Sequence, residues 1–179
     1  IDDIAKSYMR WHKHDGFDVG PTAGRMFQLV EKGMGFHKAS KQVDFETNGR
    51  TAGCNPAHRA APLATLDLNE KELIDIVIQE AKLTHWHPLA ADVSVATVLL
   101  CRKLYHGEDW HESIASVRKG RLVETQRALE SHHIDDLRGD GFAPSVLAAA
   151  MYFLMNSDNL DEAIKKSIDF AGPANYCPV

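Results

Sequence analysis

Apolar residues recur every three or four positions along most of the chain, which is the spacing of amphipathic helices. In the first such stretch, Ile1, Ile4, Ala5, Tyr8 and Met9 share one face. The pattern predicts helices over 1–12, 22–31, 69–84, 88–105, 111–131, 143–154 and 160–171. No stretch alternates apolar and polar residues as a strand does. We therefore expect a single all-α domain over residues 1–179, a multi-helix globular bundle.

Several of these helices carry clear boundary signals. Asn69 and Asn159 are good N-caps, and each is followed three residues later by a glutamate, Glu72 and Glu162, as in a capping box. The stretch over 88–105 is apolar on most sides. We expect this helix to lie at the centre of the core.

The helical pattern is broken in two places. Gly120 interrupts the stretch over 111–131, and residues 33–62 sustain no period at all. An irregular segment as long as the second one is unusual inside a compact domain, unless it is a functional loop or a poorly ordered insertion. Its glycines, prolines and polar side chains favour a functional loop.

The overall charge argues against some partners. The chain has 179 residues, a formal net charge of −5 and a pI near 6.0, so its bulk electrostatics do not favour nucleic acid or an anionic membrane. A local basic pocket for a phosphate stays open, with Arg59 as a cation that stands alone in the sequence. No apolar run is long enough to span a bilayer.

The cysteines bear on the compartment. Cys54, Cys101 and Cys177 are odd in number, lie far apart and form no CxxC pair. This argues against a disulfide framework and a cysteine-rich zinc site, so we expect a reducing, cytoplasmic location. The chain starts within a helical pattern at Ile1 with nothing before it to cap the helix. We therefore expect it to be a fragment of a larger polypeptide.

One candidate site lies at the end of the irregular segment, over 53–59. Gly53 and a following proline fix the backbone path, while Asn55, His58 and Arg59 offer hydrogen-bond donors. Such a loop can bind a phosphate or a ribose through backbone N–H groups and a cation. The alternative is a turn whose polar groups only satisfy the loop itself, and the residues alone favour this alternative.

A second candidate site is the run Thr84-His85-Trp86-His87-Pro88. Two histidines with an aromatic residue between them could ligate a metal ion or stack on a ligand. Because the sequence offers no third metal ligand nearby, ordinary polar residues at a helix end are the stronger interpretation.

These segments together resemble a known family. The run 54–63 resembles the GNGxxMRxxPL segment of the ADP-ribosylglycohydrolases, and 83–85 resembles their LTH motif. Trp11 followed by 18–22 is similar to their W…DxGxT segment, 141–150 to their GxxxxxxLxAA helix, and 161–172 to the helix before their GGDxDT signature. The five segments occur in the family's order and spacing across nearly the whole chain.

The resemblance implies an all-α hydrolase that removes ADP-ribose from proteins or small molecules with the help of magnesium. It suggests Gly53, Cys54, Asn55, Arg59 and Thr84 as substrate-binding residues. If the chemistry needs no metal, His85 or His58 could serve as the general acid or base.

The chain departs from the family where magnesium would bind. The family's early Asp-Asp-Thr cluster lies upstream of this chain, and the GGDxDT signature is replaced by 171–177, AGPANYC. In that run only Asn175 offers a side-chain oxygen suited to a metal ion, and hard cations prefer carboxylates. His58 stands at an apolar position, and Asn55 is displaced by one from the family's asparagine.

Three functions therefore remain open. The first is a hydrolase of the glycosidic bond in ADP-ribose conjugates. The second is a catalytically inactive binding or regulatory module that retains the helical scaffold. The third is a structural protein, whose composition would look the same.

Overall fold

The computed structural model describes residues 1–17, 19–131 and 133–170. Within these ranges the chain forms ten α-helices and two short 3₁₀ helices, with no β-strand. The elements are α1 (Asp2–His14), α2 (Pro21–Glu31), α3 (Phe36–Glu46), α4 (Asn55–Ala60), η1 (Ala61–Thr65), α5 (Glu70–Ala81), α6 (Pro88–Tyr105), α7 (Trp110–Arg118), α8 (Val123–Leu129), η2 (Ile134–Asp136), α9 (Ala143–Met155) and α10 (Leu160–Asp169). The predicted all-α architecture is confirmed.

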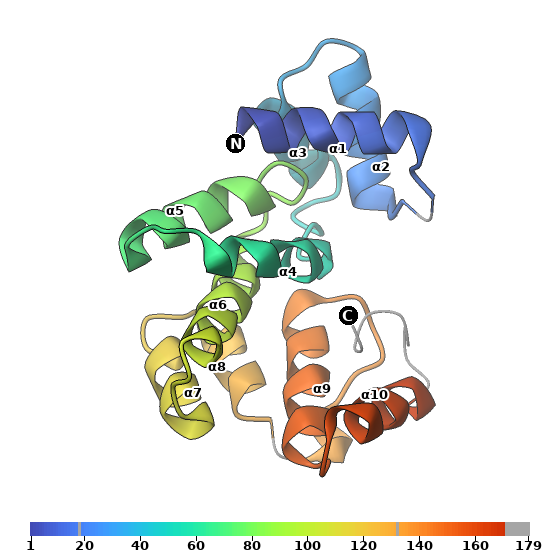
Figure 1. The fold of residues 1–179 in the computed structure, drawn as a ribbon. Coiled ribbons are helices and arrows are strands. Elements are labelled where there is room, and N and C mark those ends of the chain that lie inside the picture. Colours follow the sequence, from blue (N-terminus) through green and yellow to red (C-terminus); the bar gives the residue numbers. More distant parts are fainter. Residues whose placement is uncertain (18, 132, 171–179) are drawn as a thin grey trace.

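The helices gather in three groups (Figure 1). α1, α2 and α3 lie at one end of the molecule, α7 to α10 lie at the other, and α4, α5 and α6 lie between them. The long helix α6 contacts α4, α5, α7, α8 and α9. Ten of its residues are buried, as expected for the apolar stretch over 88–105.

The buried apolar residues form two clusters. The larger one surrounds α6 and includes Leu73, Val98, Leu129 and Met151. The smaller one lies between α2 and α3, where Met26, Phe27 and Val43 are buried, and the side chains of Tyr8 and Met9 from α1 cover it. The hydrophobic effect thus stabilises the α1–α3 end largely through contacts of its own.

The prediction of an irregular segment over 33–62 is wrong, because this range contains α3 and α4. The apolar stripe of α3 is short, and one of its core positions is Ser40, which is fully buried. The Ser40 hydroxyl donates a hydrogen bond to the carbonyl of Lys82 at 2.5 Å. Because its hydroxyl is hydrogen-bonded, a serine can occupy a core position of this helix. A polar residue at that position hides the regular spacing of apolar residues from which a helix is predicted.

The predicted interruption at Gly120 is confirmed. Gly120 has a φ of +77°, a conformation that suits glycine, and it separates α7 from α8. Asp92 of α6 secures the link, because its carboxylate accepts a hydrogen bond from the Leu122 N–H and pairs with Arg121. None of the helices in the described ranges has the length and apolar character needed to cross a bilayer.

Candidate functional site

A small pocket brings together segments that are far apart in the sequence. Its volume is about 210 Å³. The lining comes from the first turn of α2, the start of α4, the turn after α5 and the segment before α9: Gly20, Pro21, Thr22, Ala23, Gly53, Cys54, Asn55, His85 and Gly141. We call it the His85 pocket.

Backbone pairing fixes the wall of this pocket. Gly53 and Phe142 form an antiparallel bridge, in which Cys54 N–H donates to the Gly141 carbonyl and Ala143 N–H donates to the Ala52 carbonyl. Gly53 also packs directly on His85, since a Cβ at Gly53 would lie only 3.0 Å from His85 Nε2. Only a glycine allows the backbone to approach the ring so closely.

The first turn of α2 forms another part of the lining. Pro21 is the first helical residue and Gly20, the N-cap, has no side chain with which to cap the helix. The N–H groups of a first turn have no acceptor within their own helix. The Asn55 amide reaches towards this turn, with its Nδ2 3.5 Å from the position of a Cβ at Gly20.

His85 is buried beside the pocket. Its side chain is 3% exposed, and its Nδ1 lies 2.8 Å from the hydroxyl of Thr84. Burial, and secondly the positive charge of Arg59, lower the pKa of His85 to about 3. The imidazole is therefore neutral at physiological pH.

Behind His85 lies a buried polar cluster. Arg59 of α4 donates from Nε to Glu80 Oε1 at 2.6 Å and from Nη2 to Thr84 Oγ1 at 2.8 Å. Tyr8 of α1 donates to the same Glu80 oxygen at 2.5 Å, and the Arg59 guanidinium lies 4.7 Å from the Tyr8 ring centre. Burial raises the pKa of the Tyr8 hydroxyl.

This cluster bears on one expectation about Arg59. The sequence suggested a lone cation that could bind a phosphate, but the guanidinium is paired with Glu80, whose side chain is only 2% exposed. Most of the charge of Arg59 is therefore balanced inside the protein. Its structural role is to join α4 to α5 and to orient Thr84.

A second cavity adjoins the His85 pocket. Its volume is about 460 Å³, and it is lined by Ser7, Tyr8, Trp11, Val19, Gly20, Ala23, Phe27, Asn55 and Arg59. Gly20, Ala23 and Asn55 line both spaces. We call it the aromatic cavity, because Tyr8, Trp11 and Phe27 form much of its wall.

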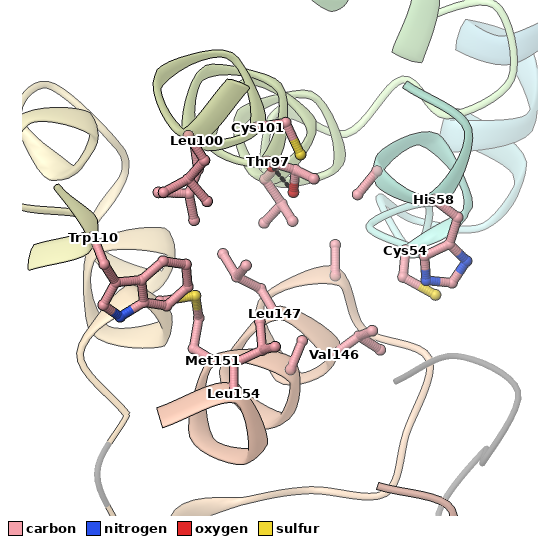
Figure 2. A pocket seen from close by; sticks show the side chains of 15 residues that line it. Cys54, His58, Thr97, Leu100, Cys101, Trp110, Val146, Leu147, Met151 and Leu154 are labelled. Atoms are coloured by element: carbon pink, nitrogen blue, oxygen red, sulfur yellow. Dashed lines mark hydrogen bonds between the residues drawn. The ribbon is translucent and has the colours of Figure 1, made fainter. Parts of the chain in front are cut away.

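His58 lies on a different side of α4. With Cys54 it borders an apolar cavity of about 200 Å³ between α6 and α9. Figure 2 shows Cys54 and His58 at one end of this cavity and Trp110 at the other, with Thr97, Leu147 and Met151 between them. His58 and His85 therefore do not line the same cavity.

His87 has a structural role. Its Nδ1 accepts a hydrogen bond from the Leu89 N–H at 3.1 Å and so caps the N-terminus of α6. The interpretation of His87 as an ordinary polar residue at a helix end is confirmed.

Comparison with known proteins places this arrangement in a family. The family model for ADP-ribosylglycohydrolase matches residues 1–175. The chain belongs to the ADP-ribosylglycohydrolase family. The resemblance inferred from the five segments is confirmed.

A solved structure supports the fold of this ADP-ribosylglycohydrolase-family chain. A chain from an "ADP-ribosylglycohydrolase-related protein complex" superposes with a TM-score of 0.74 at 20% sequence identity. The match covers 97% of this chain but only 58% of the solved chain. The chain thus spans little more than half the length of that structure. No curated protein matches its sequence.

The donor atoms of the described residues do not suit the magnesium that the family resemblance implies. Within residues 1–17, 19–131 and 133–170, no three His, Cys, Asp or Glu side chains converge as metal ligands. The His85 pocket offers the Thr22 hydroxyl and the Asn55 amide, but its described lining includes no carboxylate. Since Mg²⁺ prefers carboxylate oxygens, these residues do not fit the ion. The predicted ligand Asn175 lies outside the described residues.

The structure therefore brings together four of the residues suggested by the sequence, Gly53, Cys54, Asn55 and His85. Arg59 and Thr84 lie directly behind His85. No role was expected for Glu80, and the first turn of α2 was noted only as part of the segment over 18–22 that resembles the family. Glu80 was recognisable, because a charged residue on the apolar face of a helix signals a buried ionic partner.

Proposed function

We propose that this chain carries the ADP-ribose site of a hydrolase that cleaves the glycosidic bond of ADP-ribose conjugates. One observation supports the proposal above the others. The Gly53–Asn55 segment, His85 and the open first turn of α2 converge on one pocket, although they are widely separated in the sequence. In a chain of this family, such convergence favours a ligand site over a turn that only satisfies its own polar groups.

The lining groups suit parts of ADP-ribose. The pocket is lined by the hydroxyl of Thr22, the amide of Asn55 and the imidazole of His85. These groups can form hydrogen bonds with ribose hydroxyls and diphosphate oxygens. The adjoining aromatic cavity provides stacking surfaces of the kind that planar rings prefer. In this proposal Gly53, Cys54, Asn55 and His85 contact the ligand, while Thr84 and Arg59 support them. We assign His58 to the neighbouring apolar cavity.

Titration calorimetry with ADP-ribose tests the proposal. The 179-residue chain should bind ADP-ribose, and Asn55→Ala should weaken binding because Asn55 lines both cavities. Running each titration with and without magnesium asks whether the ion contributes. Absence of binding under both conditions would contradict the proposal.

If the chain binds ADP-ribose, hydrolysis is tested separately, by measuring the release of ADP-ribose from an ADP-ribosylated protein.

A second candidate function is a module that binds ADP-ribose without hydrolysing its conjugates. The described lining of the His85 pocket contains no carboxylate. A module that binds ADP-ribose without cleaving it would combine binding in calorimetry with no release of ADP-ribose. Release of ADP-ribose by this chain would exclude that alternative.

A further inference from the structure

Consecutive hydrogen bonds connect a buried carboxylate to the imidazole of the pocket. Glu80 Oε1 accepts from Arg59 Nε at 2.6 Å. Arg59 Nη2 donates to Thr84 Oγ1 at 2.8 Å, and that hydroxyl lies 2.8 Å from His85 Nδ1. Glu80, Thr84 and His85 are all at most 3% exposed, so water competes little for these hydrogen bonds.

The donors and acceptors fix the direction of each bond. A guanidinium can only donate, so the Thr84 oxygen is the acceptor in its bond with Arg59. A hydroxyl has a single proton, and among the described residues Thr84 has no other acceptor than His85 Nδ1. If Nδ1 carried a proton, the buried Thr84 proton would be left without a partner, which is costly. His85 Nδ1 is therefore the acceptor.

The tautomer follows from this assignment. In a neutral imidazole with a bare Nδ1, the proton is on Nε2. Nε2 faces Gly53 and the pocket, and no described residue accepts a hydrogen bond from it. The low pKa of His85 agrees with a neutral ring, because burial and Arg59 both disfavour the imidazolium.

We propose that Glu80, Arg59 and Thr84 are positioning residues that fix His85 as its Nε2–H tautomer, so that His85 donates a hydrogen bond to a ligand oxygen in the His85 pocket. The identity of the ligand rests on the proposed function, whereas the tautomer does not. In this form Nε2 has no free lone pair, so His85 does not take a proton from water. It acts as a neutral donor, and the first turn of α2 contributes Pro21, Thr22 and Ala23 to the lining of the same pocket.

Nitrogen NMR of the ligand-free chain tests the tautomer directly. With ¹⁵N-labelled histidine, the two ring nitrogens of His85 should show one protonated signal at Nε2 and one unprotonated signal at Nδ1 near neutral pH. The peaks are assigned by their loss in His85→Gln. A protonated Nδ1, or two protonated nitrogens, in the unsubstituted chain would overturn the proposal.

Substitutions at Thr84 test the positioning role. Thr84→Val removes the hydroxyl and should let both tautomers appear, whereas Thr84→Ser should restore the single Nε2–H form. Thr97→Val is a matched control, because the Thr97 hydroxyl donates to its own helix at Val93. It should leave the His85 signals unchanged. An unmixed Nε2–H signal in Thr84→Val would show that Thr84 does not set the tautomer and would overturn the proposal.

Binding separates this inference from the proposed function. If the chain binds ADP-ribose, Thr84→Val should weaken binding about three- to tenfold, the loss expected for one hydrogen bond, and Thr84→Ser should recover it. The chain could show a single Nε2–H form, which Thr84→Val converts into two tautomers, and yet fail to bind ADP-ribose. That result would support the tautomer and refute the proposed function. If the chain binds ADP-ribose but His85 is protonated at Nδ1, the proposed function is supported and the tautomer is refuted.

Discussion

At the residue scale, Gly53 lies directly against the buried ring of His85. A Cβ there would meet His85 Nε2 at 3.0 Å and His85 Cδ2 at 3.2 Å. Gly53→Ala should therefore displace the buried ring from its place beside the pocket. We expect Gly53→Ala to weaken ADP-ribose binding in calorimetry. The change in binding free energy should be larger than the change in unfolding free energy.

Gly35→Ala is the matched control for Gly53→Ala. Gly35 has a φ of −69°, and no atom lies within 4 Å of its Cβ position. The control should keep full affinity and lose about 0.5–1 kcal/mol of stability, because glycine is preferred to alanine at an N-cap. Equal affinities of the two variants would show that the Gly53–His85 contact does not shape the pocket.

His85 should make the fold sensitive to acid. Its pKa falls from 6.5 to about 3 in the folded chain, so below about pH 6.5 the unfolded chain binds a proton that the native chain does not. Stability should be unaffected above that pH and should fall as the pH drops, by up to about 1.4 kcal/mol per unit. Urea unfolding between about pH 7 and pH 5 measures the slope.

In His85→Gln this contribution to the slope should disappear. Identical slopes in the two proteins would mean that His85 is protonated as readily in the native state as in the unfolded state.

Residue identities in the site were largely predictable, but their environments were not. The spacing and motifs of the sequence identified Gly53, Asn55 and His85. They could not show that Arg59 is neutralised by Glu80, because these residues meet only when α4 packs on α5. A pKa likewise depends on burial, which is a property of the folded chain.

At the scale of elements, one ion pair joins α4 to α5. Replacing Glu80 with alanine leaves the Arg59 guanidinium, which is only 24% exposed, without its carboxylate. Removal of one partner from a buried pair typically costs about 3 kcal/mol. We expect a loss of that order in urea unfolding, together with weaker ADP-ribose binding because Thr84 loses its orientation.

Glu46→Ala is the corresponding control. Glu46 pairs with Arg25 between α2 and α3 at 2.9 Å, but the two side chains are 32% and 40% exposed. An exposed pair of this kind contributes little. A loss of stability in Glu46→Ala as large as that in Glu80→Ala would show that burial is not what makes the Arg59–Glu80 pair important.

Helices with long apolar faces were predictable from the sequence, and α3 was not. The stretch that became α6 is apolar on most sides, so its position in the core followed from composition alone. In α3 the buried face consists of Ala39, Ser40 and Val43. Ser40 is buried because its hydroxyl forms a hydrogen bond with the carbonyl of Lys82. The pattern of apolar residues in the sequence cannot show such a tertiary contact.

At the scale of the whole molecule, the division into two apolar clusters predicts uneven stability. The α1–α3 end has a small cluster of its own, whereas α6 is surrounded by the larger one. Hydrogen exchange followed by mass spectrometry should show α1–α3 opening at a lower free energy than α6. Uniform protection of both regions would mean that the clusters unfold as a single cooperative unit.

The bridge between Gly53 and Phe142 also has a consequence for biosynthesis. It closes the pocket wall by pairing two points separated by about half the length of the chain. During translation, the loop before α4 leaves the ribosome long before its partner at the start of α9 has been made. Because loop closure over such a distance is slow, a nascent chain should acquire its helices first and its ligand site last. A ribosome stalled before Phe142 would carry a chain that is already partly helical but has no complete pocket.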